Sequence, residues 1–153
     1  MKSSRFRLIL LIIFTVVLLG SVPHTISAQE LGAGAKLVGT TPFIFAEAKL
    51  WIFAAEVGVG PNMAESAPTG YEKEPYNLSL GVKIYPIEIA GFSPYLGSEN
   101  WFSLYYKQTR TFAGIEFNFP SEGVPLSIFG GGDYVLTEAE GASFGWHLGI
   151  KYT

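Results

Sequence analysis

Apolar and polar residues alternate along most of the chain beyond about residue 30, and this period of two is the pattern of half-buried β-strands. The last segment shows it most clearly. Its even-numbered residues from Ala142 to Tyr152 are all apolar, and the odd-numbered ones between them are polar or glycine. The pattern predicts an all-β protein. The predicted strands cover residues 31–38, 43–50, 53–60, 77–84, 92–106, 110–119, 125–136 and 142–152.

The apolar stretch from residue 43 to residue 60 contains a change of phase. If Glu47 lies on the polar side of one unbroken strand, Glu56 falls on its apolar side, because side chains alternate between the two faces. A tight turn or bulge between Trp51 and Ala54 restores the alternation. With this turn the sequence predicts eight strands, and without it seven.

The segments between the predicted strands differ in character. Residues 61–75, 100–109 and 137–141 are polar or irregular, whereas residues 87–91 and 120–124 are short and turn-like. Longer loops at one end and short turns at the other are typical of an up-and-down meander, in which each strand pairs with the next.

The composition of the polar face indicates which side of the strands is the interior. Beside single charges, this face carries glycines at positions 81, 97, 114, 131, 145 and 149. The solvated face of a soluble sheet usually carries many more Lys, Glu and Thr side chains. Small residues beside sparse charges instead fit the narrow lumen of a closed barrel.

The apolar face is broad and rich in aromatic residues. Several of them lie near the predicted strand ends, where membrane barrels carry aromatic girdles: Tyr85, Phe92, Phe119, Tyr134 and Tyr152. Only a closed barrel satisfies every strand backbone group inside a bilayer. The pattern therefore favours a barrel whose apolar face is turned outward.

The N-terminal region differs from the rest of the chain. Basic residues at positions 2, 5 and 7 precede an apolar run from Leu8 to Leu19, and a short polar stretch ends at Ala28. This plan is typical of a cleaved signal peptide, and the run is shorter than the roughly 20 apolar residues of a spanning helix. We assign residues 1–28 to a signal peptide and residues 29–153 to one β-barrel domain.

Removal of residues 1–28 makes the chain more acidic. The leader holds three of the ten basic residues and none of the thirteen acidic ones, so seven basic side chains remain against thirteen acidic ones. This balance argues against nucleic acid as a partner. The chain has no cysteine, which excludes disulfide bonds and thiolate metal sites.

Four segments of the mature chain carry a family resemblance: GFSPYLGSE at 91–99, TFAGIEFNFP at 111–120, PLSIFGGGDYVL at 125–136 and SFGWHLGIKYT at 143–153. Behind a signal peptide, they resemble the small bacterial outer-membrane β-barrel family. Its members have a P-Y-x-G strand, a G-x-E-aromatic strand, a Gly-rich penultimate strand and a final strand with apolar residues at every second position.

The resemblance implies a closed antiparallel up-and-down barrel of about eight strands, located in the bilayer of the bacterial outer membrane. It also implies insertion by the barrel-assembly machinery, which typically reads a terminal aromatic residue, usually Phe. This chain departs from that pattern and ends Tyr152-Thr153. Either Tyr152 serves as the terminal signal or a residue is missing.

The charged residues and the histidine on the polar face are the candidate lumen-facing residues. They are Glu47, Lys49, Glu56, Lys83, Glu99, Arg110, Glu116, Asp133, His147 and Lys151. Burying an unpaired charge is costly, so these groups must pair or keep water beside them. We interpret them as a charged plug that fills the barrel. The alternative is a narrow polar passage for ions or small solutes, although eight strands leave little more than room for side chains.

The sequence offers little catalytic chemistry. His147 is the one histidine of the mature chain, and Ser143 lies too far along the same strand face for a direct contact. The GGGD segment at 130–133 lacks the lysine of a phosphate loop, so we interpret it as close strand packing or a bulge.

We predict a non-enzymatic protein without cofactor or metal, with a structural role or a loop-mediated interaction role. The loop at 61–75 is the candidate contact for a protein partner. Two alternatives remain open: a soluble exported β-barrel that binds a small hydrophobic ligand, and an envelope lipid-modifying enzyme centred on His147.

Overall fold

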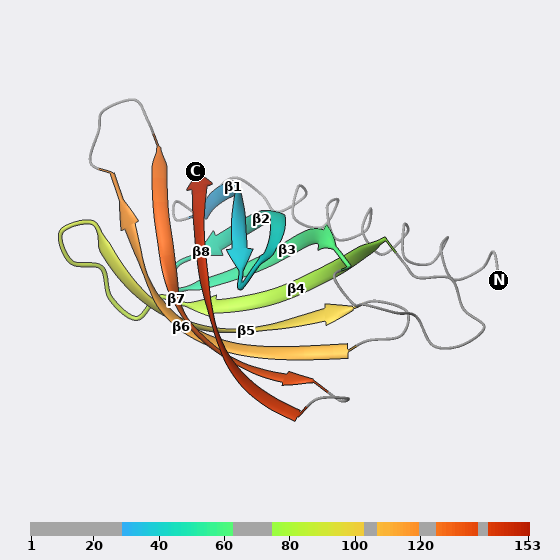
Figure 1. Ribbon diagram of the computed structural model, residues 1–153. Helices are drawn as coiled ribbons and strands as arrows, with labels where there is room; N and C mark the ends of the chain where they lie inside the picture. The colour runs from blue at the N-terminus through green and yellow to red at the C-terminus, as the bar shows by residue number, and fades with distance from the viewer. Residues whose placement is uncertain (1–28, 63–74, 103–106, 120–124, 138–140) are drawn as a thin grey trace, which may run out of the picture.

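A computed structural model describes residues 29–62, 75–102, 107–119, 125–137 and 141–153, and these residues form one closed antiparallel barrel (Figure 1). The eight strands follow one another around the barrel in sequence order, and the first pairs with the last. They are β1 (Gln29–Val38), β2 (Thr41–Leu50), β3 (Phe53–Pro61), β4 (Tyr76–Ile84), β5 (Phe92–Phe102), β6 (Lys107–Asn118), β7 (Leu126–Thr137) and β8 (Gly141–Tyr152). The predicted fold class is confirmed. Within the described residues, no helix is long and apolar enough to span a bilayer.

The turn predicted near Trp51 is present and sets the strand number at eight. β2 ends at Leu50, β3 begins at Phe53, and these two residues pair directly. Trp51 has a φ of 57°, a left-handed conformation that is uncommon for a bulky residue. The turn corrects the phase, because it brings Glu56 opposite Glu47 in the register of β2 and β3.

The predicted contrast between long loops and short turns is wrong in part. β5 continues to Phe102 and β6 begins at Lys107, so most of residues 100–109 belong to strands, and only residues 138–140 separate β7 from β8. The polar residues there are strand residues that face each other, since Thr109 Oγ1 donates to Asn100 Oδ1 at 2.8 Å. At the opposite end of the barrel, seven residues separate β4 from β5 and seven separate β6 from β7, more than the four between β5 and β6. Most of the predicted loop at 61–75 lies outside the described residues.

The GGGD segment is part of a continuous β7. Two neighbouring glycines in it differ in the space around them: Gly131 is crowded and Gly132 is not. A Cβ added to Gly131 would lie 2.0 Å from the carbonyl oxygen of Ala113 on β6. A Cβ added to Gly132 would meet nothing within 4 Å. The close strand packing predicted for this segment is therefore present at Gly131.

This difference gives a matched pair of variants. Gly131→Ala is expected to destabilise the barrel by about 1–3 kcal/mol, because β6 must move away from the added methyl group. Gly132→Ala is expected to change stability by less than about 0.5 kcal/mol, since its methyl group enters open space. Urea unfolding followed by tryptophan fluorescence measures both, and equal unfolding midpoints for the two variants would contradict the close approach.

Candidate functional site

The interior of the barrel is occupied by charged side chains. Nine of the ten predicted lumen-facing residues are buried: Glu47, Glu56, Lys83, Glu99, Arg110, Glu116, Asp133, His147 and Lys151. The tenth, Lys49, has a side chain that is 14% exposed and pairs at 3.5 Å with Glu30, which is more exposed. Lys36 is a further buried cation that the prediction omitted. The strand that contains Lys36 was predicted correctly. Ala35 and Leu37 on either side are apolar, and this alternation places Lys36 on the interior face.

Two lysines separate carboxylates that would otherwise repel each other. Glu47 and Glu56 stand directly opposite in the register of β2 and β3, an arrangement that is destabilising when both are charged. Lys83 Nζ lies 2.6 Å from a carboxylate oxygen of each. Lys36 pairs with the other oxygen of Glu56 and, at 2.7 Å, with Glu99. The two cations thus join three acidic residues from three strands.

Arg110 continues the network on the other side of Glu99. One guanidinium nitrogen lies 2.6 Å from Glu99 Oε2, and another lies 3.1 Å from Asp133 Oδ2. The guanidinium also stacks near the ring of Phe112, with 4.6 Å between its central carbon and the ring centroid. Arg110 is 1% exposed, so both of its carboxylate partners are neutralised away from water.

His147 ends the network at one side of the lumen. Its Nδ1 lies 2.6 Å from Asp133 Oδ1, and its Nε2 lies 2.5 Å from the hydroxyl oxygen of Tyr95. Ser143, which was predicted to lie too far along the strand for a direct contact, is exposed while His147 is buried. The structure therefore places His147 between an acid and a phenol and does not bring it together with Ser143.

Lys151 and Tyr85 extend the network of buried charges to Glu116. Lys151 Nζ lies 2.7 Å from both Glu47 and Glu116, and the Tyr85 hydroxyl donates to Glu116 at 2.9 Å. Tyr85 was predicted to lie on the apolar face, and this prediction is wrong, since it is buried with its hydroxyl in the network. The physical reason is its parity, because residues two apart share a face and Tyr85 follows the interior Lys83.

Aromatic rings occupy the space that the ion pairs leave. One buried cluster consists of Phe45, Ala54, Tyr85, Tyr95, Phe112 and Phe129. Nearer the end that holds the β1–β2 turn, Phe43 packs on Trp101 with 4.6 Å between ring centroids. Lys83 Nζ lies 5.1 Å from the centroid of the Phe129 ring, so the aromatic and charged groups interlock. The described interior therefore contains both paired charges and buried aromatic rings.

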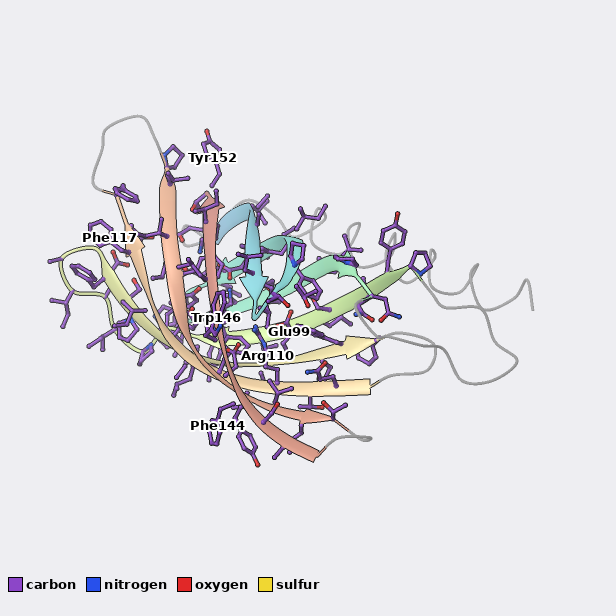
Figure 2. All side chains as sticks on the ribbon, viewed as in Figure 1. Glu99, Arg110, Phe117, Phe144, Trp146 and Tyr152 are labelled. Carbon is purple, nitrogen blue, oxygen red and sulfur yellow. The ribbon has the colours of Figure 1, made fainter. Side chains whose placement is uncertain are left out.

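The outer surface has the opposite character. Large apolar side chains are exposed on all eight strands, for example Leu31, Ile44, Val59, Val82, Leu96, Ile115, Ile128 and Leu148. In Figure 2, Glu99 and Arg110 lie within the curve of the sheet, whereas Phe117, Phe144 and Tyr152 project away from it. The barrel is thus polar inside and apolar outside.

Exposed aromatic side chains gather near both ends of this outer surface. Phe53, Phe92 and Tyr152 are exposed at the end of the barrel where β1 begins and β8 ends. Tyr76, Phe102, Tyr134 and Phe144 are exposed toward the opposite end. The outer surface therefore has an apolar middle bordered by aromatic rings.

The arrangement of titratable groups is one of mutual neutralisation. Each of the five buried carboxylates lies within ion-pair distance of at least one cationic or histidine side chain. Among the residues that the structure describes, no cluster of three or more metal-ligating side chains is arranged to hold a metal ion. The interior therefore holds acidic and basic side chains in ion pairs that join different strands.

Comparisons with models of protein families, with curated proteins and with solved structures found no match to this chain. The fold and the interior therefore define its class by themselves: a small, closed, eight-stranded antiparallel barrel with a charged core and an apolar outer surface.

Proposed function

We propose that this chain is a non-enzymatic bacterial outer-membrane protein, exported through residues 1–28 and inserted by the barrel-assembly machinery. The observation that carries the proposal is the exposure of large apolar side chains around the whole barrel. In water, a continuous apolar surface of this kind is unfavourable. In a bilayer it meets hydrocarbon, and a closed barrel pairs the strand backbone that lipid cannot hydrogen-bond.

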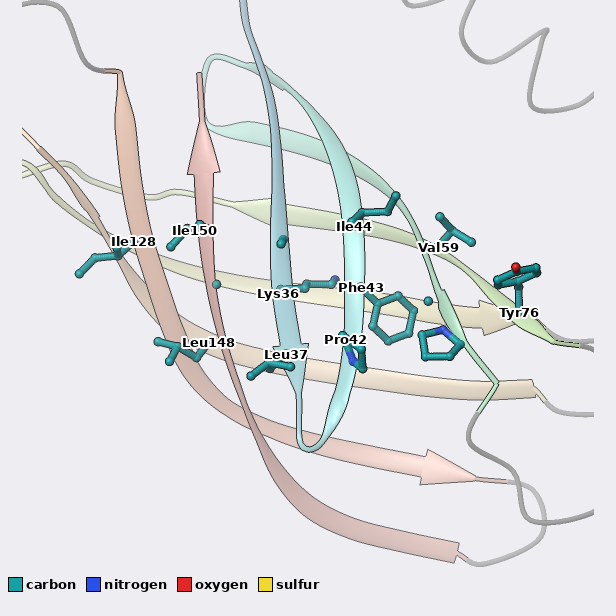
Figure 3. A pocket seen from close by; sticks show the side chains of 14 residues that line it. Lys36, Leu37, Pro42, Phe43, Ile44, Val59, Tyr76, Ile128, Leu148 and Ile150 are labelled. Carbon is teal, nitrogen blue, oxygen red and sulfur yellow. The ribbon is translucent and has the colours of Figure 1, made fainter.

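Two further features of the outer surface support a bilayer location. The aromatic side chains at both ends correspond to the girdles of membrane barrels, which lie at the level of the lipid headgroups. A groove of about 750 Å³ also crosses β8, β1, β2 and β3 on the outside, and Figure 3 shows the apolar side chains of Leu37, Ile44, Val59 and Ile150 along it. A surface of this chemistry suits the acyl chains of lipids.

The charged interior supports a structural role over transport. Ion pairs and aromatic rings fill the described lumen, and eight strands leave an interior only just wide enough for side chains. We interpret the network as the plug that stiffens the barrel. The remaining role is contact with partners through the loops, for which residues 61–75 stay the candidate.

The alternative of a soluble barrel with a small hydrophobic ligand gains no support from the interior. An apolar ligand there would have to separate buried pairs such as Lys83 and Glu47, which leaves uncompensated charges at high cost.

Cell fractionation of the full chain tests the proposal. Expressed in a bacterium with two membranes, the protein is expected in the outer-membrane fraction, to resist a high-salt wash and to be released by detergent. Mass spectrometry is expected to find Gln29 as the first residue. A periplasmic protein serves as the control for lysis, and recovery of the chain beside that control without detergent would overturn the proposal.

A further inference from the structure

The connection between β4 and β5 carries large apolar side chains on its surface. Figure 1 shows it as a loop at the left of the barrel. Ile87 is 52% exposed and Ile89 is 64% exposed. Glu88, which lies between them, is the only charged residue of positions 85–91. Turns that face water are usually polar, and this one is not.

Hydrogen bonds hold the end of this connection in one conformation. Ile89 and Phe92 exchange both of their backbone hydrogen bonds, each at 2.9 Å. Ala90 and Gly91 between them have φ values of 52° and 83°, and two positive values are what the central residues of a type I′ hairpin turn require. The Gly91 carbonyl also accepts from the N–H of Asn118 on β6 at 2.8 Å. A folded hairpin therefore presents the apolar side chains. We call residues 87–92 the apolar hairpin.

The apolar hairpin turns Ile89 to the outside of the barrel. Residues that stand directly opposite in an antiparallel pair share a face, and Ile89 stands opposite Phe92. Phe92 in turn stands opposite Phe117, with 4.6 Å between their ring centroids, and Figure 2 shows Phe117 projecting away from the barrel. The ring of Phe119 lies 5.2 Å from that of Phe117. Ile89 thus extends a row of outward apolar side chains across neighbouring strands.

From this geometry we propose that the apolar hairpin is a lipid anchor, whose Ile87 and Ile89 side chains lie between lipid molecules at the boundary of headgroups and acyl chains. This rests on the proposed function, because the anchor needs the barrel to lie in a bilayer. Lipid is favoured over a protein partner by the continuity of the surface. From the hairpin toward the middle of the barrel wall, the outward residues of β5 are Phe92, Pro94 and Leu96, and no polar side chain interrupts them.

The pairing also sets the depth of the apolar hairpin. Ile89, Phe92 and Phe117 stand side by side across the strands, so they lie at one level of the barrel wall. Aromatic side chains near the strand ends of membrane barrels lie at the interface between hydrocarbon and water. At that level, aliphatic side chains reach the acyl chains, and a single exposed acid such as Glu88 keeps contact with water.

A fluorescent label on single cysteines tests the anchor, because the chain has no cysteine of its own. Ile89→Cys in the mature chain would carry a nitrobenzoxadiazole label and be folded into phosphatidylcholine vesicles. Its emission is expected at a shorter wavelength than in water. Lipids with a nitroxide near the headgroup are expected to quench it more strongly than lipids with a nitroxide at the end of the acyl chain.

Glu30→Cys is the matched control at the same end of the barrel. Glu30 is exposed on the lumen face of β1, where it pairs with Lys49 at 3.5 Å, so its label is expected to emit as in water and to be quenched much less by either lipid. The mobility of unboiled samples on a gel shows that each labelled variant is folded. A label at position 89 that behaves like the label at position 30 would overturn the proposal.

A third position separates failure of the anchor from failure of the proposed function. Leu80 points outward in the middle of β4, and a label on Leu80→Cys is expected to be quenched most strongly by the acyl-chain nitroxide. If position 80 gives this result and position 89 emits as in water, the barrel spans the bilayer, the anchor is wrong, and the apolar hairpin is left for a protein partner. If neither label responds to the nitroxide lipids, the membrane location fails and the anchor fails with it.

Discussion

Arg110→Met is expected to destabilise the barrel by about 3–5 kcal/mol, the cost of removing one partner from a buried ion pair. Arg110 is 1% exposed and contacts both Glu99 and Asp133. Without it, Glu99 keeps Lys36 as its cation and Asp133 keeps His147. The five buried carboxylates would then face three lysines and one histidine in an interior that water does not reach.

Urea unfolding in detergent micelles, read by the gel mobility of unboiled samples, measures this loss. Lys49→Met is the control, because it removes a lysine whose pair with Glu30 is partly exposed, and such pairs contribute about 0–1 kcal/mol. A triple variant with Arg110→Met, Glu99→Gln and Asp133→Asn is expected to recover part of the lost stability, since it removes the uncompensated charges. If Arg110→Met unfolds at the same urea concentration as Lys49→Met, the network does not stabilise the barrel.

Strand positions and the buried face could be read from the sequence because both depend on local alternation. The phase change between Glu47 and Glu56 predicted a turn or bulge between Trp51 and Ala54 but left eight or seven strands open, and the turn observed at Trp51 sets the number at eight. The parity of the strands likewise predicted nine of the buried charged and histidine residues, although it missed Lys36 and included the partly exposed Lys49. In this barrel, the alternation of apolar and polar residues was therefore enough to predict most strand positions and the face of each strand that lies inside.

Errors arose where strands end. Asn100 and Thr109 were interpreted as loop residues because they are polar, but they pair across β5 and β6. Tyr85 was placed on the outside because aromatic residues are common at the ends of membrane strands, although its parity with Lys83 places it inside. At these positions, the alternation of side chains along the strand predicts the structure better than the type of residue does.

The pairs within the interior could not be predicted from the sequence. Lys36 and Glu99 are 63 residues apart, and Lys151 and Glu47 are 104 residues apart. They meet because the barrel closes with a particular stagger between β1 and β8, and the sequence pattern of one strand does not encode that stagger.

Leu80→Arg tests most directly whether the apolar surface meets hydrocarbon. Leu80 lies in the middle of β4, and its side chain points outward. An arginine on the lipid-facing surface costs about 2–4 kcal/mol near the bilayer midplane and about 0–1 kcal/mol near the interfaces. Tyr76→Arg is the matched control, because Tyr76 faces outward at the first position of the same strand.

Both variants of the mature chain would be folded into phosphatidylcholine vesicles, and their free energies of unfolding compared with that of the wild type in urea. We expect a loss of about 2–4 kcal/mol for Leu80→Arg and at most about 1 kcal/mol for Tyr76→Arg. Equal, small losses for the two variants, or a wild-type chain that folds as well in buffer as in vesicles, would contradict the claim that this barrel spans a membrane.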